Sequence, residues 1–378
     1  MASSNKNNVL AVLSLSGGND GLSTVVPYNE GLYRDYRPTL GIPAEQVIPL
    51  NKDLGLHPTM APLKSFWDEG KMAIFVGVGY PKPSYSHFRS MDIWHTCEPE
   101  KVGTEGWLGR TIEEIDPQHD NVLTGVNFGR GLPRALAKPG VPVASVGALE
   151  TYGLLTGIEG KDQRAEALEV FAKIYGPTVG TGYTMDYIHA TGTYALKGAD
   201  ILATAPGKYQ SSINYTASAV GQYMRNIVQT HLAGFGTRVL YTTSPYNGFD
   251  THANQAALHP MLWTDVSANV KSFFDDLRAH KASDNVLLFM FSEFGRRIID
   301  NGSGTDHGAA GVAFAIGEKV KGGIYGTYPS LKPSDQEEGG NLKFSTDFRS
   351  IYTTMLDGWL GLNPAPILGG TFEKMPYL

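Results

Sequence analysis

The sequence predicts an α/β protein, a three-layer sandwich with a mostly parallel central sheet. Five short apolar runs have the length of strands, and the segments between them carry apolar residues at helical spacing. Continuous apolar strands of this kind are typical of a parallel sheet covered on both faces. The five predicted strands are Val9–Ser16, Met72–Tyr80, Arg238–Ser244, Val286–Phe291 and Gly311–Ile316.

Polar clusters flank these strands. Four of the runs end in charged or hydroxylic residues, and the fifth directly follows such a cluster. Because the carboxyl ends of parallel strands share one edge, where ligands bind in open α/β sheets, we expect the clusters to converge there. The residues so gathered are Asp20, Ser86, Asp250, His252, Glu293, Asp306 and His307. This mixture indicates a hydrolytic, metal-dependent site.

Helical spacing recurs between the strands. Pro58–Glu69 would join the first two strands as a βαβ unit. Ala217–Leu232 and Pro260–His280 precede the third and fourth strands, and Asp347–Leu360 forms an amphipathic helix closed by Gly361. We expect one domain over residues 1–378 built on this pattern.

The stretch from residue 97 to residue 207 shows a less regular pattern of strand and helix signals. It mixes glycine- and proline-rich loops with one predicted helix, Asp162–Tyr175, capped by Asp162 and Glu166. We interpret this central stretch as an insertion or cap beside the sheet.

Composition excludes several classes of protein. The 378 residues carry a formal net charge of -6, and a single adjacent arginine pair near the site falls far short of a nucleic-acid surface. No run of about 18 apolar residues predicts a membrane span. Cys97 is the only cysteine, which excludes an intrachain disulfide. The polar leader Met1–Asn8 fits either a cytoplasmic start or a trimmed export signal.

The first cluster, Gly17–Gly21, contains Asn19 and Asp20. Asparagine, aspartate and glycine are the residues of turns, and this explanation is the stronger one for Asp20 alone. The alternative is a metal ligand, with glycines that let the backbone approach an ion closely. Asn19 would then contact substrate.

Ser86 lies in a segment rich in helix-start signals. Its hydroxyl is either an N-cap or a nucleophile, because a helix N-terminus stabilises an alkoxide and the anion that it attacks. His87 would assist Ser86 in catalysis, and Arg89 would bind an anionic substrate.

Asp250 and His252 follow the third strand, separated by one residue. A carboxylate and an imidazole so spaced can chelate one divalent ion, although an Asx-turn beside a surface histidine is common. Asp306 and His307 add the same pair of ligand types. Mixed imidazole and carboxylate ligands suit zinc first, then manganese or iron, with calcium or magnesium if carboxylates dominate. The remaining histidines are taken as structural or surface residues.

Glu293 follows the most apolar strand, where an unpaired carboxylate would be costly. It is either a metal ligand or half of a structural ion pair with Arg296 or Arg297. The arginines would otherwise neutralise an anionic substrate, with Arg296 in the catalytic group and Arg297 among the substrate-binding residues.

Several motifs together resemble the domain-of-unknown-function 1501 family. They span nearly the whole chain: Leu15–Tyr28, Gly55–Pro58, Gly77–Phe88, Glu293–Arg296 with Asp306–Gly308, and Asp347–Tyr352 with Trp359–Gly361. Members are similar in fold to the alkaline phosphatase and sulfatase superfamily, and many carry a twin-arginine export signal. The resemblance therefore implies an exported, periplasmic or extracellular protein.

The resemblance also implies roles for residues. Asp20 would be the first metal ligand and Ser86 the nucleophile, while Asp250, His252 and His307 would form one metal site, with Glu293 contributing to a second. The chain departs from the superfamily pattern at Phe294, where alkaline phosphatases carry a histidine. It also lacks a Cys-x-Pro-x-Arg motif, which argues against a sulfatase that depends on that motif.

These observations predict a metal-dependent hydrolase of a phosphate or sulfate ester, with a small-molecule or saccharide substrate. Two alternatives stay open. One is a metal-free serine hydrolase using Ser86, Asp306 and either His307 or His252, although no Gly-x-Ser-x-Gly elbow is present. The other is a non-catalytic exported binding protein that keeps the fold without metal.

Overall fold

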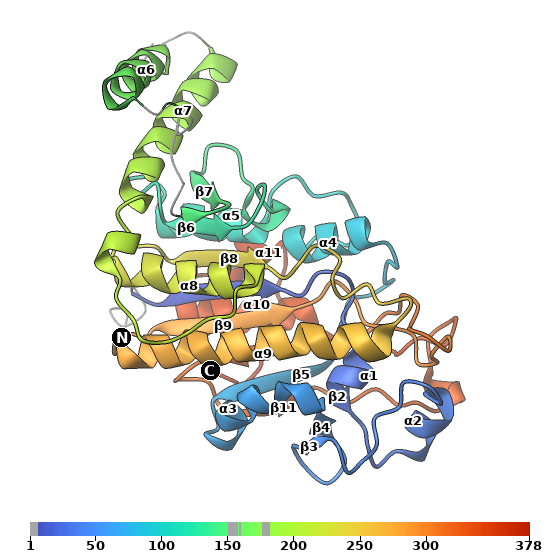
Figure 1. Cartoon of the computed structure of the whole chain (residues 1–378). Coiled ribbons are helices and arrows are strands. Elements are labelled where there is room, and N and C mark those ends of the chain that lie inside the picture. The colour runs from blue at the N-terminus through green and yellow to red at the C-terminus, as the bar shows by residue number, and fades with distance from the viewer. Residues whose placement is uncertain (1–6, 150–157, 159, 176–181) are drawn as a thin grey trace.

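A mostly parallel sheet forms the centre of the computed structural model, which describes residues 7–149, 158, 160–175 and 182–378 (Figure 1). The strands follow the order β11-β5-β10-β9-β1-β8-β6-β7, and β12 pairs with β5. Their bounds are β1 Val9–Ser14, β5 Met72–Gly79, β6 Gly125–Phe128, β7 Val143–Val146, β8 Val239–Thr243, β9 Val286–Phe291, β10 Gly311–Ile316, β11 Gly323–Tyr325 and β12 Thr346–Asp347.

One strand runs against the others. β10 pairs antiparallel with both β9 and β5, whereas β1, β8, β9, β6 and β7 pair in parallel. The amino end of β10 therefore lies at the same edge as the carboxyl ends of its neighbours. This direction explains why residues that precede the fifth predicted strand can still join residues that follow the other four.

Helices cover both faces of the sheet, which confirms the three-layer prediction. Side chains of β1 alternate between two cores: Val9, Ala11 and Leu13 in one, Leu10 and Val12 in the other. The first core is covered by α3 Lys64–Asp68, α8 Ala219–Leu232 and α9 Gln255–Ala279. The second is covered by α4 His87–Thr96, α5 Trp107–Ile115, α10 Phe348–Thr354 and α11 Pro364–Leu368.

Predicted helices and observed helices differ in detail. Pro58–Leu63 is a 3₁₀ helix that leads into α3, and a π-helix, Met355–Leu360, follows α10 and ends at Gly361 in the left-handed conformation. β1 and β5 run parallel in the same sheet and are joined by the first of these helical segments, as the predicted βαβ unit requires, with β9 and β10 between them. These two strands follow one another among the predicted strands of the chain, but they are not neighbours in the sheet.

The predicted insertion over residues 97–207 does not form one unit beside the sheet. Its strands β6 and β7 extend the central sheet beyond β8, and only α6 Lys161–Ile174 and α7 Tyr183–Leu202 project from the body as an arm (Figure 1). Helix α6 begins after Gly160 without a side-chain cap, so the predicted capping by Asp162 and Glu166 is wrong.

A small satellite sheet packs below the main one. It has the order β2-β4-β3, with β2 Val25–Val26, β3 Ile48–Pro49 and β4 Gly55–Leu56, and it lies near α1 Gly21–Thr24 and α2 Gly31–Tyr36 (Figure 1). None of the described helices has the length and apolar character needed to cross a bilayer. Most of the predicted leader, residues 1–6, lies outside the described residues.

Candidate metal centre

The loops that leave β1, β8 and β9 meet at the shared edge of the sheet. Gly17 permits this contact, because a β-carbon at its position would lie 2.4 Å from the backbone nitrogen of Asp250, and its φ of +120° is unfavourable for other residues. The backbone amide of Gly17 donates to the carboxylate of Glu293 at 2.9 Å. Segments far apart in sequence are thus joined directly behind the predicted site.

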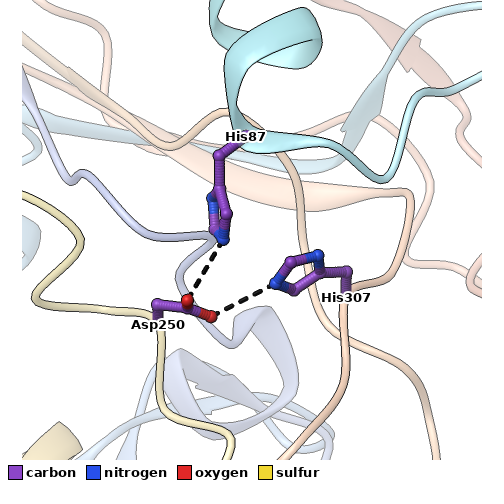
Figure 2. A group of neighbouring side chains, drawn as sticks. All are labelled: His87, Asp250 and His307. Carbon is purple, nitrogen blue, oxygen red and sulfur yellow. Dashed lines mark hydrogen bonds and ion pairs between the residues drawn. The ribbon is translucent and has the colours of Figure 1, made fainter.

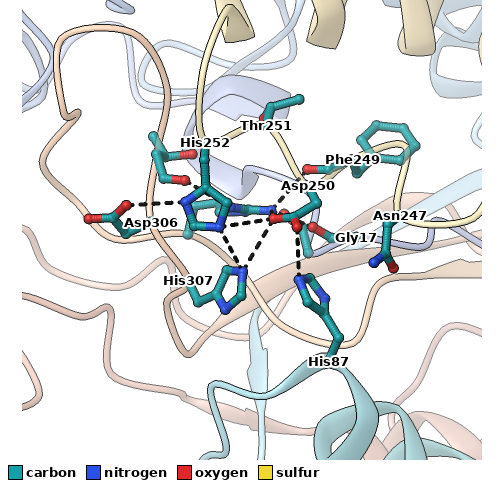
Figure 3. A network of polar contacts seen from close by, with 12 residues as sticks. Gly17, His87, Asn247, Phe249, Asp250, Thr251, His252, Asp306 and His307 are labelled. Carbon is teal, nitrogen blue, oxygen red and sulfur yellow. Dashed lines mark hydrogen bonds and ion pairs between the residues drawn. The ribbon is translucent and has the colours of Figure 1, made fainter.

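Three imidazoles converge on the carboxylate of Asp250 (Figure 3), and Figure 2 shows two of them, His87 and His307. His252 Nε2 and His307 Nε2 lie 3.1 Å and 3.2 Å from Asp250 Oδ1. His87 Nε2 lies 3.3 Å from Oδ2 of the same carboxylate. The two Nε2 atoms of His252 and His307 are 2.9 Å apart.

The other nitrogen of each imidazole is held by an acceptor outside this group. His87 Nδ1 lies 2.7 Å from Glu293 Oε1, and His307 Nδ1 lies 2.7 Å from the carbonyl oxygen of Tyr85. His252 Nδ1 lies 3.2 Å from Asp306 Oδ1. In the tautomer that carries its proton on Nδ1, each neutral ring donates to its outer acceptor and presents the lone pair of Nε2 to the centre. Metal-binding histidines are oriented by outer partners in this way.

His87 Nε2 is the second feature that suits a metal ligand. The atom is buried, yet no residue in the described ranges gives it a hydrogen bond, despite the nearby Asp250 carboxylate. Burial lowers the pKa of His87, but the hydrogen bond and charge of Glu293, together with Asp250, outweigh it and raise the pKa above its ordinary value. Surroundings that stabilise a proton on this ring also stabilise a metal ion.

The spacing of the ligand atoms fits a small divalent ion. His87, Asp250 and His307 each offer a ligand atom within 4.8 Å of the others. Four ligands at zinc distances of about 2.0–2.1 Å in a tetrahedron would stand roughly 3.3 Å from one another. The separations of 3.1–3.3 Å between each Nε2 atom and the nearer oxygen of Asp250 are close to this value. His252 stands outside the group of three, so it would have to move towards His87 to become a fourth ligand.

Protonation at neutral pH favours ligation. Burial and the charge of Arg296 lower the pKa of His307, despite its hydrogen bond to Tyr85, so the ring is neutral. Burial raises the pKa of Asp250, but the hydrogen bond and charge of Arg296 outweigh it, and the net pKa is lowered. Both side chains are therefore in the form that binds a metal.

Arg296 has a different role from the predicted one. Its side chain is buried and donates to the carbonyl oxygens of Gly18 and Thr305 at 2.6 Å and 2.8 Å, and to Asp250 Oδ1 at 2.7 Å. Carbonyls of Gly17 and Phe249 accept further bonds. Because these hydrogen bonds occupy its guanidinium group, Arg296 holds the loops together and is not free to bind substrate.

Asp20 and Asn19 lie in a separate buried network. Both carboxylate oxygens of Asp20 bond to Arg37, at 2.6 Å and 3.0 Å, and Ser23 and Gln255 also donate to it. Arg37 holds the pKa of Asp20 far below its ordinary value, against the opposing effect of burial. Asn19 Oδ1 faces His259 and Trp263 inside the protein. Neither residue joins the imidazoles, so we remove both from the candidate site.

Glu293 and Asp306 occupy positions one layer outside the ligand atoms. Glu293 is buried against His87, Gly17 and Ser292, and the expected ion pair with Arg296 is wrong because Arg296 pairs with Asp250. Asp306 bonds to the far nitrogen of His252, and that bond lowers its pKa against the effect of burial. Both carboxylates orient imidazoles.

Ser86 lies beside the cluster at the start of α4. Its side chain forms no capping bond, and it lines a cavity of about 530 Å³ together with His87 and Glu293. Arg89 lines the same cavity but is tied to Asp92 at 2.7 Å and to three backbone carbonyls. Arg297 is exposed, and its charge acts on Asp306.

Sequence reasoning assigned His87 to assist Ser86 and did not identify it as a ligand. The signal that could have corrected this was the histidine at the first position of a helix that follows a strand, level with the other polar clusters. The supporting carbonyl of Tyr85 carries no side-chain signature at all. Phe294 packs against His87 and His307, with ring centroids 4.8 Å and 4.9 Å away, and closes one side of the cluster.

The family model described as "Protein of unknown function (DUF1501)" matches residues 7–358. The chain therefore belongs to this family, as its motifs indicated. Comparison with curated proteins finds no match.

Solved structures that align with the chain include sulfatases and a phosphoethanolamine transferase. PsFucS1 sulfatase from Pseudoalteromonas sp. is 10% identical, with a TM-score of 0.42, over 98% of this chain and 71% of its own. BT1596, a 2-O GAG sulfatase, is 11% identical, with a TM-score of 0.36, over 98% and 77%. The C-terminal periplasmic domain of EptC from Escherichia coli, solved with Zn, is 10% identical, with a TM-score of 0.36, over 83% and 74%.

Proposed function

We propose that the chain is a metal-dependent hydrolase of a phosphate or sulfate ester. His87, His252 and His307 would bind one divalent cation through Nε2, and Asp250 would bind it through a carboxylate oxygen. The observation that carries the proposal is the shared orientation of the three rings: each Nδ1 faces an outer acceptor, and each Nε2 faces Asp250.

Zinc is the cation we propose, since three imidazoles and one carboxylate match its preferred ligands better than those of calcium or magnesium. Such an ion would supply Lewis acidity that stabilises negative charge on the transferred group and on an attacking oxygen. Phe294 packs against His87 and His307 and offers no ligand atom on that side of the cluster. We therefore propose one cation and not two.

Ser86 is the proposed nucleophile. Its uncapped hydroxyl opens into the same cavity as His87, at the positive end of a ten-residue helix. Attack by Ser86 Oγ on phosphorus or sulfur would form an ester on Ser86 and break the bond to the alcohol, which would leave with the proton of the Ser86 hydroxyl. Water would then hydrolyse the ester on Ser86 and release phosphate or sulfate. Glu293 and Asp306 would keep the rings of His87 and His252 aligned during this step. We further propose a small-molecule or saccharide ester as substrate and an exported location.

The metal-free serine hydrolase is less well supported. All three imidazoles near Ser86 use Nδ1 for an outer acceptor and direct Nε2 to Asp250, so no ring is directed to take the Ser86 proton. A base in hydrogen-bond reach is what that mechanism needs.

Metal analysis of protein purified without chelator, followed by assays on phosphate and sulfate esters, tests the proposal. We expect one equivalent of zinc per chain and turnover that Ser86→Ala abolishes without loss of zinc. Ser65→Ala is the matched control, since Ser65 lies on α3 outside the lining of the cavity, and we expect it to retain activity.

Each alternative has its own outcome in this experiment. A covalent adduct of Ser86 with a serine-directed probe in metal-free protein would favour the metal-free hydrolase. Neither metal nor adduct nor turnover would favour the non-catalytic binding protein. Zinc with unchanged turnover in Ser86→Ala would remove Ser86 from its role as nucleophile.

A further inference from the structure

A second cavity of about 370 Å³ continues from the one beside Ser86. Both cavities are lined by Ser16, Met91, His95 and Tyr246, so they form one groove that starts at the candidate metal centre. The second cavity runs along the carboxyl ends of β1, β8 and β6 and extends to α8. Its length beyond the centre is more than a single phosphate or sulfate group requires.

The lining of the second cavity is mostly apolar, with polar side chains interspersed and one charged residue, Arg130. His95 is buried, with Nε2 3.1 Å from the hydroxyl of Tyr241, and burial lowers its pKa to about 3, so the ring is neutral. Ser14 Oγ lies buried beside Tyr241 and has no well-formed hydrogen bond to any residue of the described ranges. Thr243 and Ser244 add further hydroxyl-bearing side chains to the lining.

Exposed aromatic rings stand along the same groove. Tyr246, shared by both cavities, is 75% exposed, and Phe88, in the first cavity, is 79% exposed. Tyr223 of α8 lines the second cavity. Large aromatic side chains left in solvent beside a cavity indicate a binding surface more often than an isolated exposed residue does.

We infer that the second cavity binds a neighbouring ring of an oligosaccharide whose esterified ring occupies the first cavity. Sugar rings present apolar C–H faces that pack on aromatic rings and hydroxyls that bond to neutral polar groups, and the groove offers both. A lipid chain would place hydrocarbon against the Thr243 hydroxyl and the charge of Arg130, which is unfavourable. The inference rests on the proposed function where it places the ester in the first cavity. Binding of the neighbouring sugar ring in the second cavity does not depend on that function.

Ala219→Trp tests the inference by filling the second cavity. Ala219 is exposed at the start of α8, lines that cavity and is absent from the lining of the first. We expect KM for a sulfated or phosphorylated trisaccharide to rise at least about tenfold, because each ordered ring contact contributes to affinity. Turnover of 4-nitrophenyl sulfate or phosphate should not change. Ala172→Trp, on the exposed surface of the α6 arm, is the matched control.

Calorimetry with unesterified sugars separates this inference from the proposed function. Maltotriose, cellotriose and laminaritriose are compared with glucose, and we expect one trisaccharide to bind the parent more tightly and Ala219→Trp to lose that gain. Trisaccharide binding that Ala219→Trp abolishes, without turnover of any ester, would support the second cavity and contradict the hydrolase. Turnover of small esters with no gain from any trisaccharide would overturn the second cavity alone.

Discussion

Asp20 and Asp250 follow two adjacent strands of the sheet, β1 and β8, and each contacts a buried arginine. The side chain of Asp20 has no exposure, and its two oxygens receive hydrogen bonds from Arg37, Ser23 and Gln255. The side chain of Asp250 is 24% exposed, and apart from arginine its neighbours are imidazole nitrogens that can act as acceptors.

This difference separates a structural carboxylate from a functional one. A carboxylate surrounded by donors is fully satisfied and stabilises the fold, whereas one surrounded by acceptors needs a cation to be stable. Both residues are aspartates in the loop that follows a strand. Their exposure and the hydrogen-bonding character of their neighbours distinguish them, and the following variants test that distinction.

The largest effect should come from removing one imidazole of the centre. In His252→Ala we expect zinc affinity to fall by more than the about 10–100-fold that loss of an outer partner costs. Because the side chain is 45% exposed, the metal-free protein should keep its free energy of unfolding within about 0.5 kcal/mol. Chelator competition measures the affinity, and His280→Ala, a histidine outside the centre, is the control. Unchanged affinity in His252→Ala would exclude this residue as a ligand.

Asp20→Asn should show the opposite pattern. It leaves the charge of Arg37 buried without a counter-charge, and breaking such a pair costs about 3–5 kcal/mol of unfolding free energy. Zinc content of the folded protein should not change. Denaturant titration measures the loss, and Asp68→Asn, which breaks an exposed pair with Lys64, should cost less than about 1 kcal/mol. Loss of zinc at unchanged stability would return Asp20 to the metal site.

The outer carboxylates should have intermediate effects. Glu293→Gln keeps the shape of the buried partner of His87 but weakens the bond to its Nδ1, and we expect zinc affinity to fall about 10–100-fold. Asp306→Asn should cost less, since its side chain is 46% exposed and its bond to His252 is longer, at 3.2 Å. An equal or larger effect in Asp306→Asn would mean that burial does not govern this outer layer.

The last expected effect is a change of stability with pH. It comes from His259, which lies in the buried network of Asn19 and Asp20. Burial lowers the pKa of His259 to about 3, so this ring stays neutral in the fold while the unfolded chain takes up a proton near pH 6.5. Stability should therefore fall as pH drops from about 6.5 towards 3, by at most about 1.4 kcal/mol per pH unit for this group.

Replacement of His259 tests this slope between pH 6.5 and 4.5. In that window Asp20 does not contribute, because its lowered pKa makes it a source of stability that is lost only below about pH 4. We expect unfolding free energies of metal-free His259→Gln to depend less on pH than those of the parent. Parallel pH curves for the two proteins would show that His259 is protonated in the fold.

The fold followed from the sequence where apolar runs were long. The predicted ranges of β9 and β10 match the structure, because Val286–Phe291 and Gly311–Ile316 are continuous apolar runs. β6 and β7, at four residues each among glycines and prolines, gave no comparable signal. The reversed direction of β10 could not be predicted either, because an apolar run looks the same when it is read from either end.

The residues that form the site could be predicted from the sequence better than the role of each residue. Asp250, His252 and His307 were expected to share a metal, and the structure brings them together. That Glu293 pairs with His87, and that Arg37 neutralises Asp20, depends on residues brought close only by the fold. Local sequence carries no information about such distant partners, so Asp20 and Glu293 were given the same role as Asp250.

The reversed direction of β10 has one more consequence. The chain leaves the sheet after Phe291 and returns at Gly311 on the same side, so the intervening loop never crosses to the far side of the molecule. This single loop holds Glu293, Asp306 and His307. Substitutions confined to residues 292–310 would therefore change the chemistry of the centre without altering any strand, provided that Arg296 keeps its bonds to the neighbouring loops.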